Sequence, residues 1–79
     1  MSQELLQKIA CELNKRYKER YLTKLDFSYA ANVDEKTIRR ILNGNQNISI
    51  LLLHNICSAL DISIYELFQS IELDQEHQS

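Results

Sequence analysis

The sequence has no proline, no tryptophan, a single glycine and no low-complexity tract. This composition excludes collagen-like and glycine-rich linker sequences, and a hydrophobic content of 44% excludes a generically disordered chain. Two cysteines are too few for a disulfide framework, so a reducing cytoplasm is the expected compartment. A chain of 79 residues has room for only one hydrophobic core, and we therefore expect one small globular domain.

Long hydrophobic runs are also missing. The longest uninterrupted apolar stretch, residues 50–53, is far shorter than the roughly 20 residues that span a bilayer. The N-terminal segment MSQELLQK is charged and lacks the apolar run of a signal peptide. We therefore expect neither a membrane segment nor a secretion signal.

Positive charge is confined to the first half of the chain. Residues 41–79 contain no lysine or arginine and carry a net charge of −5, whereas residues 15–40 carry eight basic and four acidic side chains, a net +4. A formal net charge of −2 disfavours a nucleic-acid partner unless positive potential is gathered locally, as it is here. Solvated helix faces with an acidic tail explain this separation as well as a functional polarity does.

Apolar residues at helical spacing predict a first helix over about residues 3–20. Its apolar stripe consists of Leu6, Ile9, Ala10, Leu13, Tyr17 and Tyr21. Thr23, with Asp26 three residues later, is predicted to cap a second helix that begins near Lys24. Asn32 should end this helix, because asparagine tolerates the left-handed conformation better than most residues.

Asp34 is a strong N-cap for a third helix over residues 35–42, which should end at Asn43 and Gly44. Ser49 is predicted to cap a fourth helix, and its core face is expected to consist of Ile50, Leu53, Ile56, Cys57 and Leu60. Ser63 is predicted to cap a short fifth helix with an apolar face of Ile64, Leu67 and Phe68, beyond which the chain should fray. Strand signals are weak, so the expected class is all-α with five short helices. Residues 1–69 are assigned to the domain and residues 70–79 to a polar acidic tail.

The residues of the second and third predicted helices match a known pattern of caps, core positions and turns. The matching positions are Thr23, Phe27 with Ser28, Asn32, Val33, Thr37 with Ile38, and Asn43 with Gly44. The register continues through Ser49, Leu53, Ile56, Cys57, Leu60, Ser63, Leu67 and Phe68. Over residues 13–68 the chain therefore resembles the helix-turn-helix of the phage repressor and Cro family, also called the XRE family.

The chain departs from the pattern of this family at several positions. Asn32 and Ser28 stand where the family has a glycine and an alanine, and Lys24 replaces the glutamine that usually begins the second helix. Tyr17 and Leu42 replace an arginine and a glutamate that form an ion pair in the family. Because this double replacement leaves no charge unpaired, we expect Tyr17 to pack near Leu42.

The resemblance implies a non-enzymatic, sequence-specific regulator of transcription, a repressor or a controller, that binds double-stranded DNA with its third helix in the major groove. Of the exposed positions on that helix, the resemblance points to Glu35, Lys36 and Arg40 for reading bases. Arg39 could contact either a base or a phosphate, and Asn43 is within reach of DNA. Phosphate contacts that fix the register are expected from Lys24, Thr37, Asn45 and Asn47.

The family usually dimerises, and the resemblance implies a homodimer in which Leu51 and Ile64 lie at the interface, although additional core is an equally good interpretation of both residues. The alternative function is a protein-interaction or antitoxin-like module whose acidic half binds a basic protein.

No catalytic constellation and no cofactor motif is present. His54 and Cys57 have the only metal-like spacing, and their partners would have to be Cys11 or His77, at no recognised zinc spacing. We therefore expect no metal site.

Overall fold

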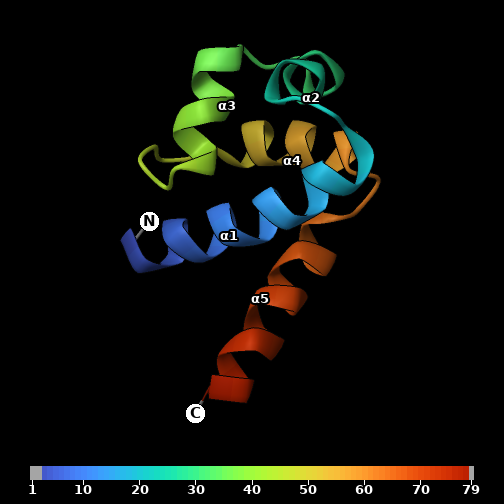
Figure 1. The fold of residues 1–79 in the computed structure, drawn as a ribbon. Coiled ribbons are helices and arrows are strands. Elements are labelled where there is room, and N and C mark those ends of the chain that lie inside the picture. Colours follow the sequence, from blue (N-terminus) through green and yellow to red (C-terminus); the bar gives the residue numbers. More distant parts are fainter. Residues whose placement is uncertain (1–2, 79) are drawn as a thin grey trace.

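The structure is a computed structural model that describes residues 3–78 of the chain, with side chains described for residues 3–71. Its elements are α1 (Gln3–Arg20), α2 (Lys24–Ala31), α3 (Glu35–Leu42), α4 (Ile50–Ala59) and α5 (Ile64–Gln78). No strand occurs within residues 3–78, and the predicted all-α class with five helices is confirmed. In Figure 1, α2 and α3 lie at one end of the molecule, α1 and α4 form the middle, and α5 extends from the opposite end.

Local hydrogen bonds determine where the helices begin. At each predicted N-cap a side-chain oxygen accepts a hydrogen bond from the backbone N–H three residues further on, with N···O distances of 3.0 to 3.3 Å. These caps are Thr23, Asp34, Ser49 and Ser63. At Ser63 the Glu66 carboxylate also accepts from the Ser63 backbone N–H at 3.4 Å, which completes a reciprocal capping box.

The core is formed by one apolar stripe from each helix. Phe27 of α2 is fully buried and its ring stacks between two tyrosines, with centroids 5.4 Å from Tyr17 and 5.6 Å from Tyr21. The Tyr21 hydroxyl donates to the carbonyl of Ala59 at 2.6 Å, and so ties the end of α1 to the end of α4. Tyr17 and Leu42 are both buried in this core, and the predicted contact between the two side chains stays a prediction.

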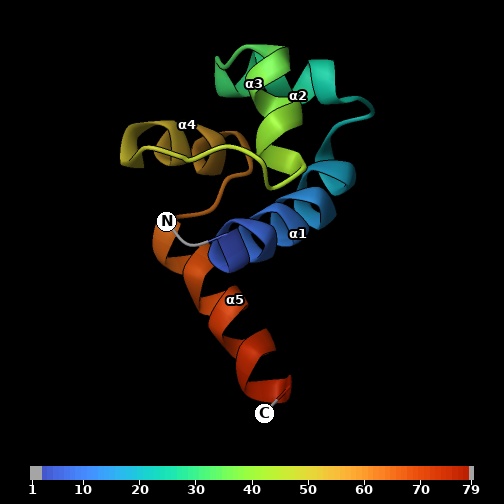
Figure 2. The same cartoon turned by 90° about the vertical axis from the view of Figure 1, so that its left-hand side faces the viewer.

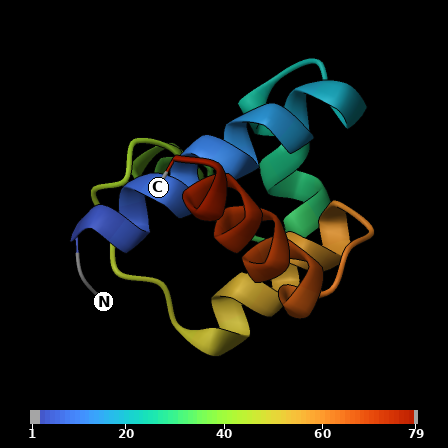
Figure 3. The same ribbon diagram turned by 90° about the horizontal axis from the view of Figure 1, so that it is seen from below.

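The helices pack so that α1 supports both ends of the molecule. It contacts α3 on one side and α5 on the other, while α2 packs on α3 and α4, and α4 also contacts α5. Figure 2 shows α3 and α2 above α1. In Figure 3, which looks at the molecule from below, α5 lies nearest the viewer, in front of α1 and α4. Arg16 links α1 to α5, because its Nη2 donates to Ser70 Oγ at 2.9 Å.

Two sequence-based expectations about the core were wrong. Ile50 was assigned to the buried face of α4, yet 69% of it is exposed. It lies in the first turn of α4, beyond the edge of the core, and Ile48 just before the Ser49 cap is buried in its place. The fifth helix is also longer than predicted, since Ile71 is buried one turn after Leu67 and the backbone stays helical to Gln78.

The predicted acidic tail overlaps this longer helix. The core reaches Ile71, two residues beyond the predicted domain boundary, whereas the side chains of residues 72–79 lie outside those that the structure describes. No single described helix is long and apolar enough to cross a membrane, and only the bent pair Ile50–Ala59 and Ile64–Ile71, with 91° between them, reaches that length and composition.

Candidate nucleic-acid interface

The third helix has one buried and one exposed face. Ile38 and Ile41 are fully buried and Leu42 is 5% exposed, whereas Lys36, Arg39 and Arg40 are exposed. Val33, just before the helix, packs against the same core from a half-buried position. The apolar face therefore holds α3 on α1 and α2, and turns the basic side chains of this helix outward.

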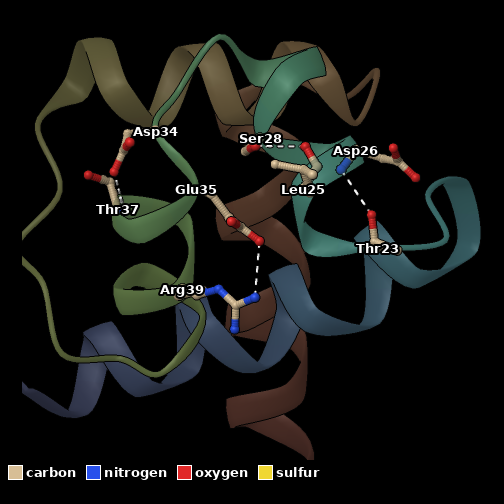
Figure 4. Close-up of polar contacts among 8 residues, drawn as sticks. All are labelled: Thr23, Leu25, Asp26, Ser28, Asp34, Glu35, Thr37 and Arg39. Atoms are coloured by element: carbon tan, nitrogen blue, oxygen red, sulfur yellow. Dashed lines mark hydrogen bonds and ion pairs between the residues drawn. The ribbon is translucent and has the colours of Figure 1, made fainter.

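A tight turn joins α2 to α3. Asn32 is in the left-handed region with φ of 55°, and its N–H and that of Val33 donate to the carbonyls of Tyr29 and Ser28 at 3.1 and 3.0 Å. The buried Ser28 hydroxyl donates to the Leu25 carbonyl at 2.6 Å, so serine is accommodated where the family has alanine (Figure 4). The turn therefore accommodates both departures from the family pattern.

Glu35 and Arg39 form an ion pair along the exposed surface of α3. Glu35 Oε2 lies 3.0 Å from Arg39 Nη2, and the two side chains are 34% and 57% exposed (Figure 4). This pair was not predicted from the sequence, although a spacing of four residues is a known signal for it. Lys36 and Arg40 make no ion pair with any side chain among residues 3–71, so their charges face solvent uncompensated.

The other predicted contact residues lie around α3. Lys24 is half-buried in the first turn of α2, and Thr37 is half-buried in α3, where its backbone N–H donates to the Asp34 cap. The loop between α3 and α4 exposes Asn43, Asn45 and Asn47. All nine predicted DNA-binding residues therefore lie on α2, α3 or the loop that follows α3, and none is fully buried.

Two residues of α1 touch the end of this region and were not singled out from the sequence. Asn14 Nδ2 donates to the backbone carbonyl of Leu42 at 2.9 Å, and the Gln7 side chain lies directly against Gly44. No local pattern identifies these contacts, because each joins residues nearly 30 or more positions apart.

The two predicted interface residues differ in exposure. Leu51 is 70% exposed, and Ile50 beside it and Tyr65 on α5 are exposed to a similar degree. Ile64 is half-buried and packs against the core. The additional-core interpretation therefore fits Ile64 better than Leu51.

Both cysteines are free, Cys11 on the surface and Cys57 in the core. Burial raises the pKa of the Cys57 thiol to about 11. Among the described residues, no three histidine, cysteine or acidic side chains lie close enough to hold a metal ion. The side chain of His77, one of the partners considered for His54 and Cys57, is outside the described part.

Comparison with known proteins agrees with this geometry. A family model described as the Cro/C1-type HTH DNA-binding domain matches residues 12–72. The structure is similar to the wild-type restriction-modification controller protein C.Esp1396I, with a TM-score of 0.82, 26% identity, and coverage of 92% of this chain and 95% of that one. A variant of that protein with a tyrosine replaced by phenylalanine gives a TM-score of 0.84 at 25% identity and 95% coverage of both chains. No curated protein matches the sequence.

Proposed function

Because the chain belongs to the Cro/C1-type helix-turn-helix DNA-binding family, we propose that it regulates transcription as a homodimer, with α3 reading a specific sequence in the major groove. The observation that carries this proposal is the outward face of α3, where Lys36 and Arg40 are exposed and unpaired among the described side chains while Ile38 and Ile41 anchor the helix. The similarity to a restriction-modification controller protein supports a controlling function, and the DNA-binding family is consistent with a cytoplasmic protein.

Three side chains are assigned to base reading. Lys36 and Arg40 suit the acceptor atoms of guanine, and a carboxylate such as that of Glu35 accepts from the amino group of cytosine. The bond to Arg39 uses only part of the acceptor capacity of Glu35, so the pair leaves room for a base contact. The pairing also holds Arg39 beside the helix, which favours a phosphate over a base as its partner.

The remaining contacts are assigned to the DNA backbone. Lys24 supplies a charge at the start of α2, and Thr37, Asn43, Asn45 and Asn47 supply uncharged hydrogen-bonding groups. Such contacts fix the position of a protein on the duplex without reading sequence. They account for the polar, uncharged composition of the loop after α3.

The proposed dimer uses the outward face of α4 and the start of α5. Leu51 and Tyr65 are exposed there, and Ile64 contributes from its half-buried position. No charged residue occurs between residues 42 and 60, so the α4 part of this face brings no like charges together in a two-fold contact.

The test of DNA binding is a salt series on a duplex selected from a random library. Replacing Arg39 and Arg40 together by alanine should abolish binding at physiological salt and leave the helical circular dichroism unchanged. At low salt, where residual binding is measurable, the magnitude of the slope of log affinity against log salt should fall by about 4, because each subunit of the proposed dimer loses two cations and each lost cation releases about one counterion fewer.

Lys8→Ala is the matched control. Lys8 pairs with Glu4 on the side of α1 that also carries Arg16, which reaches α5 and not α3. Its affinity and salt slope should equal those of the unaltered protein. Intact duplex binding by the double variant would exclude α3 as the recognition surface.

A further inference from the structure

The C-terminal end of α3 is completed by a side chain from another helix. The turn at residues 43–45 satisfies the carbonyls of residues 39–41 with its own backbone N–H groups, at 3.0 to 3.1 Å. The carbonyl of Leu42, the last of the helix, accepts instead from Asn14 Nδ2 at 2.9 Å. Since the last four carbonyls of a helix have no partner within it, Asn14 supplies the one bond that the turn does not.

The Asn14 amide is itself held in one orientation. Its Nδ2 carries two hydrogens, and the second bond goes to the Ala10 carbonyl at 2.8 Å, one turn earlier in α1. The amide therefore bridges the backbone of α1 and the backbone of α3. A rotated amide would turn its oxygen toward both carbonyls and lose both bonds, so the two bonds fix the orientation of the side chain.

A second contact from the same face of α1 lies against the turn. Gln3, Gln7, Ala10 and Asn14 follow at spacings of four and three, so they form one stripe on the helix. Gly44 has φ of 73°, and a Cβ at this position would lie 2.9 Å from Cδ and Nε2 of Gln7. The Gln7 amide is thus seated on the glycine backbone, at the point where the chain leaves α3.

The loop beyond Gly44 is not packed on α1 in the same way. An open cavity of about 310 Å³ is lined by Gln3, Leu6, Gly44, Asn45 and Asn47. The chain returns to the core only at Ile48, which is 7% exposed. The placement of Asn45 and Asn47 therefore depends on how the loop is held at its start, by Asn14 and Gln7, and at its end, by Ile48.

We propose that Asn14 is a positioning residue for DNA binding, and that with Gln7 it holds the end of α3 and the loop of residues 43–47 where the loop asparagines meet the phosphates. This inference rests on the proposed function. In this proposal α1 positions the loop of residues 43–47 relative to the duplex, although α1 itself carries none of the predicted contact residues.

The uncharged nature of the loop gives this role a distinct signature. Contacts from asparagine release no counterions, so misplacing the loop should lower affinity by the same factor at every salt concentration. Loss of a cationic contact lowers affinity and also reduces the salt slope. A purely structural role for Asn14 would lower the melting temperature and leave the affinity of the folded protein unchanged.

The experiment compares Asn14→Asp and Asn14→Ala with Arg40→Ala on the same selected duplex, by fluorescence anisotropy at a temperature where circular dichroism shows every variant to be folded. Asn14→Ala should bind about tenfold more weakly, the effect of roughly one net hydrogen bond and the misplaced contacts that follow, with an unchanged salt slope. Asn14→Asp, which loses the same bonds and adds a negative charge, should bind at least as weakly. Arg40→Ala should reduce the magnitude of the slope by about 2, one for each subunit of the proposed dimer. In the Asn14 variants, the amide resonances of residues 43–47 should shift in nuclear magnetic resonance spectra.

Asn55→Asp on α4 is the control for adding a negative charge by the same chemical change, and it should bind like the unaltered protein.

Gln7→Ala provides a test that does not depend on folding of the Asn14 variants, because Gln7 is exposed. This variant should bind about threefold more weakly with an unchanged salt slope, a loss of binding free energy smaller than that of one net hydrogen bond.

The two proposals fail in different ways. Unchanged affinity in the Asn14 and Gln7 variants, with weakened binding by Arg40→Ala, would overturn the positioning role and leave the proposed function standing. Absence of duplex binding by the unaltered protein, with no difference for Arg40→Ala, would overturn both.

Discussion

Cys57 shows how burial controls the chemistry of a single side chain. The residue is 1% exposed, and burial raises the pKa of its thiol from the ordinary 9.0 to about 11. Nearby Arg16 acts in the opposite direction and Glu66 in the same direction, but burial has the largest effect. Since the folded-state pKa is the higher one, the thiol contributes its full stabilisation below pH 9, and this contribution is lost as the pH rises toward 11.

The two cysteines should therefore differ sharply in reactivity. At pH 8 a thiol-specific reagent should modify the exposed Cys11 at once and Cys57 only at the rate of unfolding, because the thiolate is the reactive form. The measurement is the time course of thiol release. In Cys11→Ser only the slow phase should remain, and a fast reaction of that variant would contradict the burial of Cys57.

Two neighbouring arginines among the nine proposed DNA contacts differ in their ion pairing. Arg39 is partly neutralised by Glu35 at 3.0 Å, whereas Arg40, next to it in the chain, has no ion-pair partner among the described side chains. An exposed pair of this kind contributes little to stability, about 0.3 to 0.5 kcal/mol. The ion pair instead affects where the side chains point, because it holds Arg39 along the helix and leaves Arg40 available to the proposed duplex.

At the scale of elements, the connection between α2 and α3 depends on one backbone conformation. Asn32 has φ of 55°, a region in which residues with a Cβ are strained and asparagine is better tolerated than most. The turn must be this tight because Val33 and the Asp34 cap follow at once, and α3 has to return across α2. The angle of the recognition helix is therefore sensitive to the residue at this position.

Asn32→Ala should destabilise the fold by about 1 kcal/mol or slightly more, which lowers Tm by roughly 4–8 °C in a domain of this size. Asn32→Gly should lie within about 0.5 kcal/mol of the unaltered protein, because glycine removes the strain and loses some chain entropy in exchange. Thermal denaturation followed by circular dichroism measures both. Equal Tm values for the alanine variant and the unaltered protein would mean that the turn is not strained.

The end of α3 is the other element boundary on which the site depends. Three of its carbonyls are satisfied by the following turn and the fourth by Asn14, so the loop of residues 43–47 starts from a position that α1 helps to define. The first helix thus has two supporting roles, one toward the proposed DNA contacts and one toward α5 through Arg16.

For the whole molecule, the separation of charge along the chain corresponds to a separation of tasks. Residues 15–40, with a net charge of +4, form the C-terminal part of α1, the whole of α2 and most of α3. Residues 42–60, which include α4, carry no charge. The basic side chains of α2 and α3 are proposed to face DNA. The uncharged face of α4 with Leu51, together with Tyr65 on α5, is proposed to face a second copy of the chain. Distinct surfaces allow both partners to bind at once, as a two-fold site on DNA requires.

Leu51→Asp should weaken self-association by at least about tenfold, because it places two like charges near each other across a two-fold interface. Sedimentation equilibrium at high micromolar concentration, without DNA, measures the effect. Leu22→Asp is the matched control, since Leu22 is 96% exposed between α1 and α2 and lies outside the proposed interface. A monomeric unaltered protein under these conditions would contradict the homodimer.

The sequence by itself determined the helices, their N-caps and the two faces of α3, because each depends on hydrogen bonds and apolar spacing within a few residues. Only the tertiary structure decided which isoleucine near Ser49 is buried, since Ile48 and Ile50 have equal hydrophobicity and only the outline of the core distinguishes them. The same holds for the extension of α5, which follows from a place in the core for Ile71, and for the bond from Asn14 to Leu42 across 28 residues. Such contacts are set by how helices meet in space, and no local periodicity encodes that meeting.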